Sequence, residues 1–100
     1  MKISEIKMQD ILDYLKIDES DADADVRQEL ATFKDAAVGY VKSYTGLSAE
    51  ECDKHEDLTV AVFILISDFY DNRAMYLPSN QAQVSKAVEN ILGLYQMNLL

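Results

Sequence analysis

The stretch that most constrains the fold of this chain is Asp57–Leu77, which contains its longest apolar run, Val60–Ile66. That run is far shorter than the ~20 residues that a helix needs to cross a bilayer, so we expect a core element. Its β-branched residues would also suit a buried strand. However, its apolar residues recur three and four apart, and no glycine or proline interrupts the stretch before Pro78. We therefore predict a central helix that must be covered on nearly every side.

Length and composition indicate one globular domain that covers residues 1–100. An apolar fraction of 49%, with three glycines and one proline, argues against disorder and favours long helices. The net charge of -9 argues against general nucleic-acid binding, because phosphate backbones are bound by clustered Lys and Arg. The single cysteine, Cys52, cannot form an internal disulfide, which fits a reducing cytoplasm. The N-terminus lacks a signal peptide's apolar core and no transmembrane segment follows, so we expect a soluble protein made in the cytoplasm, without a membrane partner.

Two helices are expected before the central one. The first is short and ends near Lys16, because apolar residues recur at helical spacing at Met8, Ile11, Leu12 and Leu15. The second runs from about Asp23 to Tyr44 and ends at Gly46, which suits the left-handed position after a helix. Its apolar seam should pack against the central helix and consists of Val26, Leu30, Phe33, Ala37, Tyr40 and Tyr44.

The acidic segment Asp18–Asp25 separates these two helices. Aspartates at positions 21, 23 and 25 reproduce the opening of a calcium-binding loop. Val26 stands where that loop needs its glycine, and Thr32 stands where it needs a bidentate glutamate. We therefore expect a solvated connector whose last aspartates cap the following helix.

A second connector, Leu47–Glu56, leads into the central helix. Ser48 opens a capping-box sequence that predicts one helical turn. Cys52 and His55 stand three apart, as metal ligands or a nucleophile and its base could. No other Cys or His exists to complete a zinc site, and no orienting group or oxyanion donor can be assigned. We expect Cys52 to pack inward and His55 to lie on the surface.

The C-terminal part of the sequence predicts one more helix. A polar stretch follows Pro78, and a helix is expected from about Gln83 to Leu94 because of the apolar spacing of Val84, Val88, Ile91, Leu92 and Tyr95. The last residues, Gln96–Leu100, carry no charge, which indicates docking on a neighbour.

These patterns predict an all-α fold, a small bundle of four to five helices around a central apolar helix. The core is expected to contain Leu30, Phe33, Ala37, Tyr44, Leu58, Ala61, Leu65 and Phe69. The sequence has no Gly-rich phosphate loop, nucleophile elbow or pair of histidines, so we expect no enzyme, cofactor or metal site. The surplus of apolar and aromatic residues favours self-association. Candidate subunit-interface residues are Val60, Phe63, Tyr70, Arg73, Leu99 and Leu100.

The order of these features resembles the head-tail connector proteins of tailed bacteriophages, a family that includes proteins assigned to DNA packaging in phages and prophages. The similarity covers nearly the whole chain. It is carried by four stretches: the helix end Tyr14–Asp18 with its acidic connector, the helix end Tyr40–Gly46, the aromatic and polar cluster Asp68–Arg73, and the last helix, Val84–Tyr95.

The resemblance implies a non-catalytic subunit of a homo-oligomeric ring, a dodecamer when assembled and a monomer alone, at the head-tail junction of a virion. Its partners would be the portal protein and tail or head-completion proteins, after assembly in the host bacterial cytoplasm. DNA would pass through the channel without sequence-specific binding, and an acidic wall would let the duplex slide. The family's long loop between the last two helices is short here, at Leu77–Gln83.

Two other classes of function compete with this hypothesis. A small acidic helical regulator or adaptor could bind a basic partner protein, but it should spread carboxylates over one extended face. Here the densest acidic cluster lies in one connector, Asp18–Asp25. A small enzyme that uses Cys52 and His55 would lose its activity in Cys52→Ala.

Overall fold

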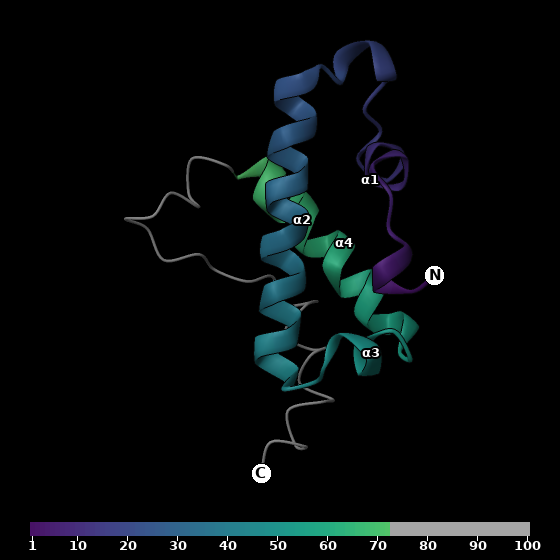
Figure 1. The fold of residues 1–100 in the computed structure, drawn as a ribbon. Helices are drawn as coiled ribbons and strands as arrows, with labels where there is room; N and C mark the ends of the chain where they lie inside the picture. The colour runs from purple at the N-terminus through teal and green to yellow at the C-terminus, as the bar shows by residue number, and fades with distance from the viewer. Residues whose placement is uncertain (73–100) are drawn as a thin grey trace.

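The computed structural model describes residues 1–72, and every regular element in this part of the chain is helical (Figure 1). Two short 3₁₀ helices and four α-helices follow one another in this order: η1 (Ile3–Glu5), α1 (Met8–Leu15), η2 (Glu19–Asp21), α2 (Ala24–Thr45), α3 (Ala49–Cys52) and α4 (Glu56–Asp71). The predicted all-α class is confirmed for these residues. The expected helix Gln83–Leu94 lies outside them.

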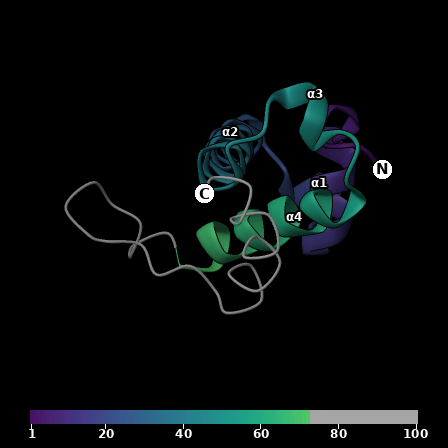
Figure 2. The same ribbon diagram turned by 90° about the horizontal axis from the view of Figure 1, so that it is seen from below.

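The packing of α2 against α4 forms the centre of the fold. In Figure 1, α2 stands upright in front of α4, which runs diagonally behind it, and α1 is seen end-on beside them. Seen from below in Figure 2, α4 lies across the molecule under the end-on α2. The prediction that the second and central helices are partners is confirmed.

The apolar run forms a helix and not a strand. Residues spaced three and four apart along α4 are at most 4% exposed, and they are Leu58, Thr59, Ala61, Val62, Leu65 and Ile66. The helix ends at Asp71, earlier than the expected end at Leu77. Asn72 leaves helical geometry, and both its backbone N–H and its side-chain amide donate to the Asp68 carbonyl, at 3.0 and 3.1 Å. A short polar side chain that bonds the backbone in this way competes with helix continuation.

The ends of α2 follow from local sequence. The Asp23 carboxylate accepts a hydrogen bond from the Val26 N–H at 2.9 Å, so the acidic connector caps this helix as expected. Gly46 ends it in the left-handed region with φ 73°. The buried side of α2 differs from the predicted seam, because the line of full burial continues from Leu30 and Ala37 to Val41 and Thr45.

Aromatic side chains of the predicted seam lie at the edge of the core. Phe33 is half-buried and packs against Phe69, with ring centroids 5.9 Å apart. Tyr44 is half-buried and stacks on Tyr40 at 6.0 Å. The fully buried residues of α2 are instead smaller or aliphatic ones, such as Ala37 and Val41.

The N-terminal segment carries two core residues that helical periodicity did not single out. Ile3 and Ile6 are 6% and 3% exposed. The Thr59 hydroxyl donates to the Met1 carbonyl at 2.7 Å, and the Lys34 ammonium donates to the Ile6 carbonyl at 2.9 Å. This segment is therefore tied to both α2 and α4.

The two described glycines should respond in opposite directions to alanine. Gly46→Ala should lower the free energy of unfolding by about 1 kcal/mol, because φ 73° is costly for a residue with a Cβ. Gly39→Ala should raise it by about 0.5–1 kcal/mol, since a helical alanine loses less chain entropy on folding. A Cβ at Gly39 would meet no atom within 4 Å. Urea denaturation of both variants measures these differences, and changes of the same sign would contradict the prediction.

Candidate functional site

A groove of about 350 Å³ lies between α2, α3 and the N-terminal segment. One wall is a single side of α2, formed by Lys34, Asp35, Val38, Gly39 and Lys42. The opposite wall comes from Ile3 and Ser4 of η1 and from Ala49, Cys52 and Asp53 at α3. Its lining is mostly apolar.

Two lysines mark the ends of the groove along α2. Lys34 and Lys42 are eight residues apart, which places their backbones about 12 Å apart along a helix axis. The Lys34 ammonium is already bound to a backbone carbonyl, whereas Lys42 is exposed. Val38 and Gly39 lie between them. The groove therefore has an apolar middle and a lysine at each end along α2, and two aspartates, Asp35 and Asp53, also line it.

The far wall of the groove is held by Ser4 and Asp53. The Ser4 hydroxyl and the Ser4 N–H donate to the two Asp53 carboxylate oxygens at 2.7 and 3.0 Å. These hydrogen bonds hold the pKa of the Asp53 carboxyl below its ordinary value of 3.8, and the one from the hydroxyl has the larger effect. They connect the N-terminal segment to the residue that directly follows α3.

The lowered pKa of Asp53 predicts a dependence of stability on pH. The unfolded chain binds a proton at Asp53 near pH 3.8 and the folded chain does so at lower pH. The contact between Ser4 and Asp53 therefore makes its full contribution to the free energy of unfolding above pH 3.8. That contribution is lost as the pH falls through the pKa of Asp53 in the folded protein. Ser4→Ala should raise the Asp53 pKa toward 3.8 and flatten this loss.

A carbon-detected NMR titration of the carboxyl groups measures the Asp53 pKa in both proteins, and urea denaturation over acidic pH measures stability. Glu51 provides the internal control. Its pKa is also lowered, by hydrogen bonds from Ser48 in the capping box, and Ser4→Ala should leave it unchanged. An Asp53 titration that is the same in both proteins would contradict the prediction.

Cys52 lies at the base of the groove wall and is 1% exposed. Burial raises the pKa of the Cys52 thiol above its ordinary value of 9.0, against the lowering effects of the Lys42 charge and a hydrogen bond with Thr45. His55 is not among the groups that act on this thiol, and it is the residue that precedes α4. Cys52 packs inward as expected, and the geometry gives it a structural place between α2 and α3.

The acidic connector is built as a capped turn. Asp23 caps α2, and η2 precedes it in the chain. Among residues 1–72, no group of three or more His, Cys, Asp or Glu side chains could hold a metal ion.

A second surface of interest is the side of α4 that faces away from the core. Val60, in the second turn of this apolar helix, is 51% exposed. With about 100° per residue, Val60 lies on the opposite side of the helix from Leu58 and Val62, and Ile64 and Ser67 flank it. Ile64 and Ser67 are half-buried, and Asp71 at the end of this line is exposed. We call the line Val60, Ile64, Ser67 and Asp71 the outer stripe.

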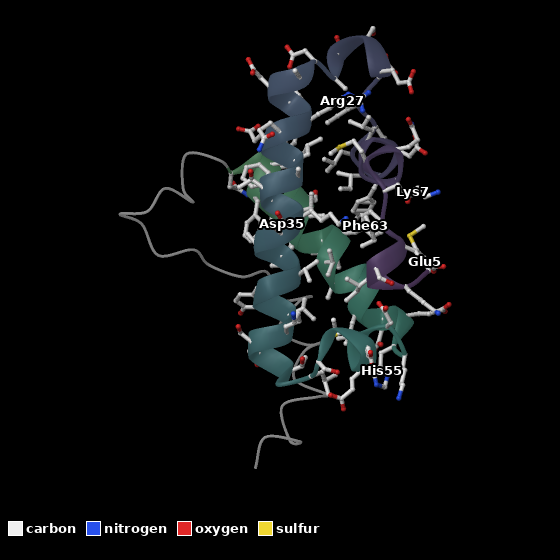
Figure 3. All side chains as sticks on the ribbon, viewed as in Figure 1. Glu5, Lys7, Arg27, Asp35, His55 and Phe63 are labelled. Atoms are coloured by element: carbon white, nitrogen blue, oxygen red, sulfur yellow. The ribbon has the colours of Figure 1, made fainter. Side chains whose placement is uncertain are left out.

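The other predicted interface residues are placed differently. Phe63 makes an edge contact with Tyr14 of α1, with ring centroids 5.1 Å apart, and Figure 3 shows it between α4 and α1. Tyr70 is half-buried and packs against the core. Within one subunit both rings already have neighbours, which leaves Val60 as the exposed member of the set. Arg73, Leu99 and Leu100 lie outside the described residues.

Of the predicted core residues, Leu30, Ala37, Leu58, Ala61 and Leu65 are at most 1% exposed. Phe33, Tyr44 and Phe69 are half-buried around that core. The groove itself was missed from the sequence, because its walls combine residues from three separate segments. One local signal existed: Ile3 and Ile6 stand three apart, which is the spacing of one helical side.

None of the helices described, residues 1–72, has the length and hydropathy that a membrane span requires. Comparison of the chain with protein-family models, with curated proteins and with solved structures found no match.

Proposed function

We propose that this chain is a structural assembly subunit that forms a homo-oligomeric ring, in the manner of the head-tail connectors that its sequence resembles. The observation that carries the proposal is the exposure of Val60, 51%, in the second turn of the most apolar helix. Burying an apolar side chain of this size between two subunits contributes about 1–2 kcal/mol to the free energy of association at each contact. A ring repeats that gain around its axis.

The outer stripe has the position that such an interface needs. A ring is built from a heterologous contact, so each subunit must present two different surfaces. The stripe is on the side of α4 that points away from α2, while the groove is on the side of α2 and α3. Figure 2 shows α2 and α3 on one side of the molecule and α4 on the other.

The perturbed titratable groups support a structural role. Each resolved shift among the described residues has a cause in the fold: the capping box for Glu51, burial for Cys52 and the Ser4 contact for Asp53. Cys52 and Asp53 both line the groove, but each shift is explained by a contact within the fold. The proposal therefore assigns no reaction to the chain.

The resemblance supplies the place of this ring. We propose that it sits between the portal and the tail components of a virion, where it continues the DNA channel. The net charge of -9 supports this, because an acidic wall repels phosphates and lets a duplex slide.

Val60→Asp tests the proposal. Sedimentation velocity over a wide concentration range, with negative-stain microscopy, should show wild-type rings, and Val60→Asp should weaken self-association at least about tenfold, or about 1.4 kcal/mol. Ala36→Asp adds the same charge on an exposed position of α2 and should assemble as wild type does. The two variants should have similar thermal stability as monomers.

Two results would contradict the proposal. One is a wild-type protein that stays monomeric at every concentration and forms no rings even beside its portal partner, which would favour the acidic adaptor. The other is a Val60→Asp protein that assembles as well as the Ala36→Asp control.

A further inference from the structure

We infer that the groove of one subunit receives the outer stripe of a second copy. This inference rests on the proposed ring function and names the two surfaces that meet in it. The groove is the receiving surface on α2, α3 and the N-terminal segment, and the inserted residue is Val60 of α4, with the exposed part of the half-buried Ile64 beside it.

Shape and polarity match at the middle of this contact. The groove offers an apolar floor at Val38, Gly39 and Ile3. Gly39 leaves open space where a Cβ would stand, so a neighbour's side chain can approach the α2 backbone closely. A volume of about 350 Å³ accommodates a few aliphatic side chains. Val60, with Ile64 one turn further, presents such side chains on one side of a helix.

Charge matches at one end of the contact. Lys42 lies at one end of the groove along α2 and is exposed. The stripe ends in the exposed carboxylate of Asp71, the last residue of α4. At the other end of the groove, the Lys34 ammonium is bonded to the Ile6 carbonyl. We therefore pair Lys42 with Asp71, which sets the direction of α4 in the groove.

The arrangement of the two surfaces makes the contact heterologous. Val60 and Asp71 of the stripe are exposed on α4, and the groove is lined by α2, α3 and the N-terminal segment. One subunit can therefore use its groove and its stripe at once, with a different neighbour on each. Such a contact propagates from copy to copy and closes into a ring when the rotation permits. A second copy fits better than an unrelated acidic helix, because the chain itself supplies the matching stripe.

Cysteine cross-linking tests the pairing directly. In a Cys52→Ala background, Gly39→Cys marks the groove and Val60→Cys marks the stripe. Mixing the two full-length proteins with a short bismaleimide should give a mixed dimer, and neither protein alone should give one. Gln28→Cys replaces Gly39→Cys as the matched control, since Gln28 is exposed on α2, does not line the groove and lies about 16 Å from Gly39 along the helix axis. The mixed product should be lost with it.

A second measurement does not depend on introduced thiols. Lys42→Glu should weaken self-association several-fold, and adding Asp71→Lys to the same chain should restore it, because the swapped charges meet across the interface. The thermal transition of each variant at low concentration shows that the subunit still folds. A Lys42→Glu protein that assembles as wild type does would overturn the inference.

The outcomes separate the inference from the proposed function. Oligomers in native mass spectrometry without the mixed dimer would mean that another surface or segment occupies the groove, which overturns the inference and leaves the ring. Dimers formed by the Val60→Cys protein alone would show a contact between identical stripes and would also overturn it. A protein that forms no oligomers, even beside its portal partner, overturns both.

Discussion

Leu65→Ala should lower the free energy of unfolding by about 3 kcal/mol, within the usual range of about 2–5 kcal/mol for such a change in a tight core. Leu65 is 1% exposed and lies on the side of α4 that packs against α2. The alanine removes the apolar side chain and leaves a cavity, because the two helices cannot both collapse onto it. Since small domains are stable by only about 5–15 kcal/mol, this loss is large.

Urea denaturation at a protein concentration below the self-association range measures this effect. Val60→Ala is the matched control on the same helix, because Val60 is 51% exposed and its truncation should change stability by less than about 0.5 kcal/mol. If Leu65→Ala and Val60→Ala lowered the free energy of unfolding equally, the assignment of the inward and outward sides of α4 would be wrong.

Ile6→Ala should lower the free energy of unfolding by nearly as much as Leu65→Ala does, about 2–4 kcal/mol, although Ile6 lies in a short segment without an α-helix. Ile6 is 3% exposed, so its truncation also leaves a cavity. The Lys34 ammonium bonds its carbonyl at 2.9 Å, and this contact keeps the segment on α2. Loosening the segment should therefore also expose the wall of the groove formed by Ile3 and Ser4.

Denaturation and amide hydrogen exchange measure the two consequences of Ile6→Ala. Exchange should accelerate at the Ser4 N–H, which donates to Asp53 in the wild type. Lys7→Ala serves as the control, since Lys7 is exposed and directly follows Ile6. If Ile6→Ala lowered the free energy of unfolding by less than about 1 kcal/mol, the N-terminal segment would be dispensable for the core.

Much of the secondary structure could be predicted, because its signals lie within a few residues of each other. The short helix ending near Lys16, the cap at Asp23 and the left-handed Gly46 all appear in the structure. The capping box at Ser48 also forms, with the Glu51 N–H donating to the Ser48 hydroxyl at 3.1 Å. Caps and turns depend on neighbouring backbone groups, so the sequence carries their full specification.

The candidate site could be predicted only in part, because burial depends on segments that are distant in sequence. Val60 and Phe63 belong to the same apolar run, yet Val60 is exposed and Phe63 packs on Tyr14, which is far from it along the chain. Helical periodicity shows that a residue is on a given side of its own helix. It does not show whether another element covers that side.

By itself, the sequence determined that residues 1–72 form helices, where most of those helices begin and end, and that the most apolar helix is the central one. The tertiary structure alone decided which apolar side of α4 stays uncovered and where the groove opens. The physical reason is that the walls of the groove are held together by contacts between distant residues. Ser4 and Asp53 are 49 residues apart, and Lys34 and Ile6 are 28 residues apart. Local propensities do not encode such contacts, since they form only when whole helices pack together.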